Sequence, residues 1–162
     1  MFMEIATTVT VLVGLLGAGV TYGTDTFAAV VWDSALKRLT KAELTRVVGF
    51  VHYYGDRRLP IPGAIGAVAI VSSAILAFVG HDPAAGGLRA AAAVLTLVWL
   101  AIYFIVAKPI NARFTEAALQ GNELDDGPSL EAAWNRVIIP RVLLLAGVIV
   151  LLGLSLYHHH SG

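Results

Sequence analysis

Cysteine is absent from the sequence, and charged residues are scarce. Without cysteine, the chain can form no disulfide bond, no thiolate nucleophile and no cysteine-ligated zinc or iron–sulfur cluster. Charged residues make up 14% of the 162 positions, whereas an average soluble domain carries roughly 25%. Lysine and arginine total 11, as do aspartate and glutamate, so the formal net charge is zero and gives no electrostatic basis for binding nucleic acid.

Apolar residues dominate what is present, at 57% of the chain, and they gather in four long runs. These runs cover residues 5–32, 61–79, 88–107 and 137–157. A helix needs about 20 mostly apolar residues to cross the hydrocarbon core of a bilayer. We therefore expect an all-α integral membrane protein, a four-helix bundle that forms one transmembrane domain over residues 1–162.

The first run begins beside an acidic residue, Glu4, and continues well past the length of a signal peptide without a clear cleavage signature. We therefore expect it to be a retained helix. Arg89, at the start of run three, is the one basic residue on the side of the turn between runs two and three, and the other ten lie between runs one and two, between runs three and four, or at the start of run four. The positive-inside rule then predicts cytoplasmic loops at 33–60 and 108–136, with both termini outside the inner (plasma) membrane of a bacterium.

A further helix is expected between the first two spans. Thr40 and Glu43 form a capping-box pattern, in which each side chain accepts a hydrogen bond from the other residue's backbone N–H. Leu44 and Val48 then begin a helical apolar spacing, which predicts an amphipathic cytoplasmic helix. Pro60 ends this segment and opens the second span, since proline is tolerated in a first helical turn.

Ionisable residues cluster ahead of the second span. His52 and Asp56 lie four residues apart, on one side of the amphipathic helix, and Arg57 and Arg58 follow. Together with Asp25, His52 and Asp56 could act as an acid/base site or as a facial metal site with imidazole and carboxylate ligands. Alternatively, the arginines contact lipid phosphates and the other side chains only form local hydrogen bonds.

Two more polar residues are expected near the same side of the membrane. Asn111 and Arg141 each follow a proline close to the ends of the third and fourth spans. They could join Asp25, His52 and Asp56 around a polar pocket. Equally, they could be interhelical contacts, with Arg141 neutralising Asp25 or Asp56.

Aromatic residues are a third group of candidates. They could line a substrate cavity, or they could form the interfacial belt and the core, as aromatic residues of membrane proteins commonly do. The group consists of Tyr22, Tyr53, Tyr54, Trp99, Tyr103 and Trp134. The consecutive residues His158, His159 and His160 do not converge on one helix face, and we leave them out of the expected site.

Four sequence elements carry a resemblance to a known family. They are "GVTYGTDTFAAVVWDSALKRL", "HYYGDRRLP", "KPINARF", and Trp134 followed seven residues later by Arg141. These elements resemble the anthrone oxygenase-like family of small four-helix membrane proteins, over a stretch from about Gly14 to about Leu156. Fungal members similar to this family oxidise polyketide anthrones to anthraquinones with molecular oxygen, without a metal or organic cofactor.

The resemblance implies a cofactor-independent oxygenase that acts on an aromatic or lipophilic small molecule at the cytoplasmic side. His52 would be the base, Asp56 would orient its ring, and Asn111 and Arg141 would hold the developing oxyanion. The expected substrate pocket consists of Asp25, Tyr22, Tyr53 and Trp134.

A non-catalytic interpretation stays open beside the enzymatic one. The first run is rich in small residues, among them Gly14, Gly17, Gly19 and Gly23. Small residues allow helices to approach closely in lipid, so this run could pack against a second copy of the chain or against a larger membrane complex. The protein would then be a structural or accessory subunit. The chain has no internal repeat of the kind that transporters use for alternating access.

Overall fold

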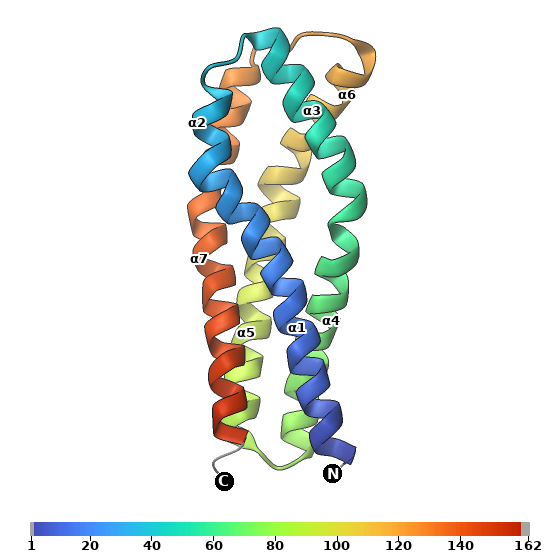
Figure 1. Ribbon diagram of the computed structural model, residues 1–162, viewed down its shortest axis with the longest axis vertical. Helices are drawn as coiled ribbons and strands as arrows, with labels where there is room; N and C mark the ends of the chain where they lie inside the picture. Colours follow the sequence, from blue (N-terminus) through green and yellow to red (C-terminus); the bar gives the residue numbers. More distant parts are fainter. Residues whose placement is uncertain (1, 160–162) are drawn as a thin grey trace.

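The computed structural model describes residues 2–159, and Figure 1 shows them as one elongated helical bundle. No strand occurs in this part of the chain. His160, the last residue of the histidine run, lies outside the described residues, and the side chains of His158 and His159 are not described. The described fold is therefore all-α, as predicted.

The elements follow one another with short links. In chain order they are α1 (Phe2–Phe27), the π-helical turn η1 (Ala28–Trp32), α2 (Asp33–Leu36), α3 (Lys41–Arg58), α4 (Pro60–Val79), α5 (Pro83–Ile102), the π-helical turn η2 (Tyr103–Ala107), α6 (Lys108–Gln120) and α7 (Gly127–His159). Helix α1 packs against α4 and α7, and α5 packs against α4 and α7, which closes a four-helix ring. Helices α3 and α6 pack against each other and extend the bundle.

Four helical segments are long and apolar enough to cross a membrane: Met3–Leu36, Pro60–Val79, Pro83–Gln120 and Gly127–Tyr157. This confirms the predicted number of spans and gives the chain the character of an integral membrane protein. The bounds differ from the predicted runs, since three of the segments continue beyond them. Most of the predicted loops 33–60 and 108–136 is helical, since α2, α3, α6 and the start of α7 occupy these stretches and α3 packs against α6.

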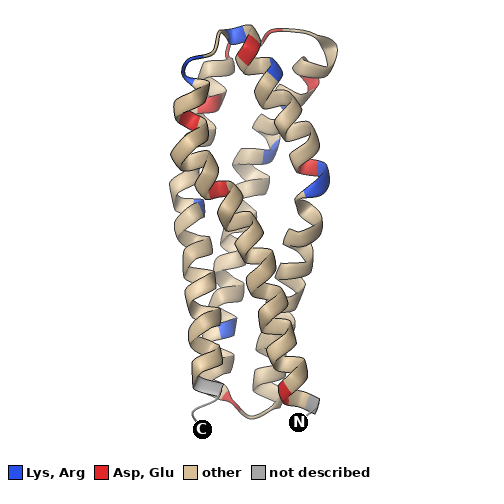
Figure 2. Ribbon diagram, viewed as in Figure 1, with Lys and Arg blue, Asp and Glu red and all other residues tan. Residues whose placement is uncertain are grey.

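The two ends of the bundle differ in their content of charged residues. We call the end with both termini and the 80–82 turn the terminal end, and the end with links 37–40 and 121–126 the loop end (Figure 1). Figure 2 shows that most lysine, arginine, aspartate and glutamate residues lie in the half nearer the loop end. Arg89, in the opposite half, is fully buried and bonds Ser155 and the Ser73 carbonyl oxygen instead of lying in a loop.

Helix α3 begins as its sequence pattern predicts. The Thr40 hydroxyl accepts a hydrogen bond from the Glu43 N–H at 3.3 Å, and the Thr40 N–H donates to the Glu43 carboxylate at 2.8 Å, which confirms the capping box. The Thr40 N–H and the Thr40 hydroxyl both donate to the Glu43 carboxylate, and these two bonds hold the pKa of this exposed group below its usual value. Arg58 ends α3 and Pro60 begins α4, as predicted.

Pro109 lies inside a continuing helical path, next to a π-helical turn. The sequence predicts a break or kink there because proline lacks an N–H and crowds the preceding turn. In the structure, η2 precedes Pro109, and the Lys108 N–H donates to the Tyr103 carbonyl across the wider turn. The π-helical turn accommodates the proline, and α6 runs on to Gln120.

Small residues set the contact between α1 and α4. A Cβ atom added to Gly17 would lie 2.5 Å from the Gly66 Cα atom and 2.8 Å from the Pro62 carbonyl oxygen. Gly17 therefore belongs to a close backbone contact within the chain. Gly19 and Gly23 face open space, where an added Cβ atom would meet nothing within 4 Å.

This contact predicts a position-specific effect of alanine. We expect Gly17→Ala to lower the free energy of unfolding by about 1–3 kcal/mol, because the α1 and α4 backbones must move apart. Gly19→Ala is the matched control on the same helix and should be neutral or slightly stabilising. Thermal unfolding in a mild detergent measures both. Equal midpoints for the two variants would contradict the close contact.

Candidate functional site

A buried ion pair joins α1 to α7 near the middle of the bundle. Arg141 donates from Nη2 to Asp25 Oδ1 at 2.8 Å and from Nε to Asp25 Oδ2 at 3.1 Å. The side chains of Arg141 and Asp25 are only 6% and 5% exposed. Trp99 on α5 donates from its indole N–H to the same carboxylate at 2.9 Å. Asp25 thus holds three helices together through charge-assisted hydrogen bonds.

Aromatic rings surround the Arg141 guanidinium group. Its Cζ atom lies 5.1 Å from the Trp99 ring centroid, 5.6 Å from that of Trp134 and 5.9 Å from that of Tyr103. These distances are within the range of cation–π attraction. Trp99 and Tyr103 stack nearly parallel, at 7° and 6.2 Å. The arginine charge is therefore balanced by one carboxylate and by aromatic faces, with little exposure to solvent.

Asp56 connects α3 to the helical path through α5, η2 and α6. Its carboxylate accepts a hydrogen bond from the Tyr103 hydroxyl at 2.9 Å and bonds from the Asn111 amide N–H at 3.1 and 3.2 Å. Tyr103 is the first residue of η2. The π-helical turn therefore lies directly beside the Asp56 carboxylate. Single π-helical turns within helices are frequently found at functional sites.

His52 lies one turn before Asp56 on α3, with its ring centroid 6.0 Å from that of Trp134. Burial lowers the pKa of His52, the Asp56 carboxylate offsets part of this effect, and the positive charge of Arg141 adds to it, so that the pKa is about 4. The imidazole is consequently neutral at neutral pH. A neutral imidazole has a free nitrogen lone pair and can accept a proton.

Two buried polar atoms of this cluster lack a hydrogen-bond partner within residues 2–159. They are the Asn111 amide oxygen, an acceptor, and the Trp134 indole nitrogen, whose N–H is a donor. Unpaired polar atoms are costly in a buried environment and native proteins seldom leave them so. A water molecule or a ligand with one donor and one acceptor would satisfy both.

The structure brings together most of the candidates that the sequence singles out. We call the polar cluster the set of Asp25, His52, Asp56, Trp99, Tyr103, Asn111, Trp134 and Arg141, whose members are connected by the contacts above. The hydrogen bonds of Trp99 and Tyr103 were not predicted from the sequence, in which both residues are candidates only for a cavity lining or for the aromatic belt and core. Their spacing of four residues within an apolar run, which places both on one helix face, was the available signal.

Two of the predicted pocket residues, Tyr53 and Tyr22, are not members of the polar cluster. Tyr53 packs under the Arg57 guanidinium at 3.7 Å and edge-on to Tyr54 at 5.0 Å. Arg58 lies 5.0 Å over the Tyr54 ring. This exposed group agrees with the interpretation of the arginines as an interfacial feature. Tyr22 lies on α1, three residues before Asp25, and is half-buried.

A facial metal site does not form from the described side chains. No group of three His, Cys, Asp or Glu residues within residues 2–159 is arranged to hold a metal ion. Asp25 is bonded to Arg141 and Trp99, while Asp56 is bonded to Tyr103 and Asn111. Asp25, His52 and Asp56 therefore do not form the facial metal site that the sequence offers as one alternative.

Two cavities differ greatly in size. The larger, of about 560 Å³, lies at the loop end, and its lining includes Asp33 and Glu131 but no member of the polar cluster. The smaller, of about 20 Å³, is lined by Thr21, Thr96 and Trp99 among others. Its volume suits a single water molecule beside the polar cluster.

No family model, curated protein or solved structure matches this chain. The fold and the site by themselves define the class of protein. It is an all-helical bundle with the character of an integral membrane protein, built around a buried, aromatic-lined polar cluster.

Breaking the buried ion pair should cost far more than breaking an exposed one. We expect Arg141→Met to lower the free energy of unfolding by about 3–5 kcal/mol, because it leaves Asp25 buried and unpaired. The control is Arg113→Met, which breaks the solvent-exposed pair with Asp126 at 2.8 Å and should leave the unfolding midpoint almost unchanged. Thermal unfolding in detergent compares them, and similar midpoints for both variants would refute a structural role for the buried pair.

The lowered pKa of His52 predicts how stability depends on pH. The unfolded chain binds the His52 proton near pH 6.5, whereas the folded protein binds it only near pH 4. The contribution of neutral His52 to stability is therefore complete above about pH 6.5 and is lost progressively as the pH falls toward about 4. His52→Gln should unfold with a weaker pH dependence over this interval than the wild type. The matched control, His81→Gln in the exposed 80–82 turn, should follow the wild-type curve.

Proposed function

We propose that this protein is a small enzyme of the bacterial inner (plasma) membrane, with the loop end in the cytoplasm and both termini outside. The distribution of basic residues supports this orientation. Ten of them lie within residues 37–58 and 108–141, on the side of the loop end, whereas Arg89 alone lies on the side of the terminal end. In this arrangement α3 is a cytoplasmic amphipathic helix. Its buried face includes Leu44 and Val48, whereas Lys41 and Arg46 are exposed.

The activity we propose is the cofactor-independent oxidation of a lipophilic aromatic molecule by molecular oxygen. One observation carries it: a neutral, half-buried imidazole lies beside a buried guanidinium group, in a cluster that leaves one hydrogen-bond donor and one acceptor unpaired. The carbonyl or hydroxyl group of an aromatic ligand would match these atoms, and the helices around the cluster would have to separate to admit the ring, because the cavity beside it measures about 20 Å³. The sequence resemblance to the anthrone oxygenase-like family supports the same chemistry.

The proposed reaction begins with His52 removing a proton from a methylene group that lies between aromatic rings. The positive charge of Arg141 and the unpaired Trp134 N–H stabilise the oxyanion that forms by delocalisation. The anion reacts with O₂ to form a C–O bond, and the resulting peroxide takes the proton back from His52. Loss of the second C–H proton with cleavage of the O–O bond then gives a ketone. The balance is CH₂ plus O₂ to C=O plus H₂O.

In this proposal Asp56 acts on His52 through its negative charge. The hydrogen bonds that its carboxylate accepts come from Tyr103 and Asn111. Asp56 thereby holds these two groups in place and partly offsets the effect of burial on the pKa of His52. The role is positioning, together with stabilisation of the imidazolium that forms during proton transfer.

A non-catalytic role is the second candidate, and a specific observation favours it. Partners within the cluster satisfy both carboxylates, since Asp25 is paired with Arg141 and Asp56 accepts hydrogen bonds from the neutral Tyr103 and Asn111 side chains. Such a network would serve equally well as an interhelical brace in an accessory subunit. Gly17 packs within the chain, so a partner helix would need another part of the surface, such as that near Gly19 and Gly23.

Oxidation of anthrone tests the proposal directly. We expect the protein in lipid nanodiscs to convert anthrone and O₂ to anthraquinone faster than empty nanodiscs do. His52→Ala should lose roughly 100-fold or more of the protein-dependent rate, as removal of a general base does. His81→Asn, in the exposed turn, should keep the wild-type rate. Product absorbance and oxygen uptake measure the reaction.

The same experiment separates the two candidates. If neither anthrone nor related ring ketones are oxidised above the rate of empty nanodiscs, the enzymatic proposal fails and the brace remains. If His52→Ala retains the full rate, catalysis does not use this imidazole as a base. A rate lost in His52→Ala, with thermal stability retained, supports the catalytic role.

A further inference from the structure

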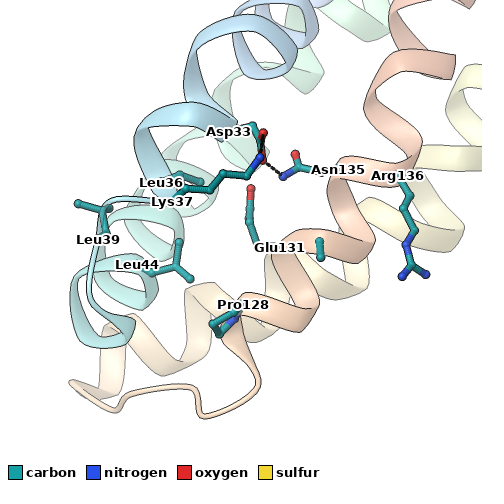
Figure 3. A pocket seen from close by; sticks show the side chains of 10 residues that line it. Asp33, Leu36, Lys37, Leu39, Leu44, Pro128, Glu131, Asn135 and Arg136 are labelled. Carbon is teal, nitrogen blue, oxygen red and sulfur yellow. Dashed lines mark hydrogen bonds and ion pairs between the residues drawn. The ribbon is translucent and has the colours of Figure 1, made fainter.

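The large cavity at the loop end lies between α2 and the start of α7, apart from the polar cluster. Its volume is about 560 Å³, within the range of small-molecule sites. Figure 3 shows the side chains around it, with Asp33 and Leu36 contributed by α2 and Glu131 and Asn135 by α7. Leu44 from α3 and Pro128 add apolar surface. The cavity thus combines an apolar wall with a small number of polar groups.

The charge of Asp33 is already balanced. Its Oδ2 atom accepts from Lys37 Nζ at 2.6 Å, and its Oδ1 atom accepts a bond from the Asn135 amide N–H at 2.5 Å. Both oxygens of this carboxylate are therefore engaged. Lys37 gives one ammonium N–H to Asp33, one turn along the helix, and makes no hydrogen bond to Glu131. The Lys37 side chain is mostly exposed, so its charge is directed toward Asp33 and solvent.

Glu131 is the exception. It is only 8% exposed, and its Oε1 atom has no hydrogen-bond partner within residues 2–159. The Asn135 amide oxygen, one turn further along α7, is also buried and unpartnered. Figure 3 shows the Glu131 carboxyl group pointing into the space between α2 and α7. An ionised carboxylate at this position is strongly unfavourable without a compensating group, so Glu131 is protonated in the empty cavity or paired with a cation in the filled one.

The chemistry of the unpaired atoms selects the partner. Both are acceptors, so the ligand must donate hydrogen bonds, and the uncompensated carboxylate calls for a positive charge. A metal ion is a poor match, because no set of three ligating side chains forms within the described residues. Arg136 also lines the cavity, but Figure 3 shows its guanidinium group directed away from Glu131. An ammonium group on an apolar body fits both the acceptors and the apolar wall.

We propose that this cavity binds an amphiphilic primary amine as its ammonium ion. Glu131 and Asn135 accept hydrogen bonds from the ammonium group, and Leu36, Leu44 and Pro128 contact the apolar body. The ammonium group belongs either to a free amphiphilic amine or to the ethanolamine headgroup of a lipid. The proposal does not depend on the oxidation chemistry of the polar cluster, which lies elsewhere in the bundle.

Calorimetric titration of the full chain in phosphatidylcholine nanodiscs tests this site, with empty nanodiscs subtracted. The probes are 4-phenylbutylamine and 4-phenylbutan-1-ol, which have the same apolar body but differ in charge. We expect the amine to bind at least about tenfold more tightly than the alcohol. Glu131→Gln should weaken amine binding by about tenfold or more and leave the alcohol unchanged. The control Glu123→Gln, on the exposed 121–126 link, should bind both probes as the wild type does.

Further measurements keep the outcome decisive. Glu131→Gln removes a buried charge, so its unfolding midpoint should equal or exceed that of the wild type, and Asn135→Ala gives an independent loss of one acceptor. Nanodiscs that contain phosphatidylethanolamine should weaken binding of the added amine if the lipid headgroup is the occupant, and should not if it is a free amine. Equal affinity for amine and alcohol, or unchanged amine affinity in both Glu131→Gln and Asn135→Ala, would overturn the proposal.

Discussion

The pairing of Asp25 with Arg141 is the interaction on which the rest of this bundle depends. Each charge alone would be costly to bury, and together they are acceptable only because Trp99 completes the carboxylate shell and aromatic rings face the guanidinium. Meeting those conditions requires α1, α5 and α7 to hold one relative register. A shift of any of these helices by one turn would separate the charges, so the pair specifies the arrangement of the helices as well as stabilising it.

Two kinds of contact fix the helices of this bundle in different ways: the close approach at Gly17 and the hydrogen bonds of Asp56. At the Gly17 contact the attraction is van der Waals and short-ranged, and it sets how near α1 lies to α4. At Asp56 the attraction is directional, and it sets how α3 and the α5–η2–α6 path are rotated toward each other. The π-helical turn η2 accommodates Pro109 and still places the Tyr103 hydroxyl within hydrogen-bond distance of the Asp56 carboxylate.

The polar cluster and the loop-end cavity illustrate opposite solutions to burying a carboxylate. Donors from the same chain satisfy both carboxylates: Arg141 balances the charge of Asp25, and the neutral Tyr103 and Asn111 side chains donate hydrogen bonds to Asp56. Glu131 lies among apolar residues and a neighbouring carboxylate that is already paired, and its free oxygen has no donor within residues 2–159. The first arrangement suits a rigid, preorganised environment in which a neutral His52 can exchange a proton. The arrangement at Glu131 favours the binding of a positively charged molecule, which would donate hydrogen bonds to the free oxygen.

Local patterns in the sequence determined the four apolar helices, the capping box at Thr40 and the concentration of charge toward one end, because length, hydropathy and caps depend on neighbouring residues. The gathering of Asp25, His52, Asp56, Asn111 and Arg141 was anticipated only as one of two alternatives. Tertiary structure alone decided that Arg141 pairs with Asp25, 116 positions away, and that Asp56 turns to Tyr103 and Asn111. It also brought Glu131 beside Asp33 at the cavity. Such pairings depend on helix register and rotation, which packing of the whole bundle sets and no local pattern encodes.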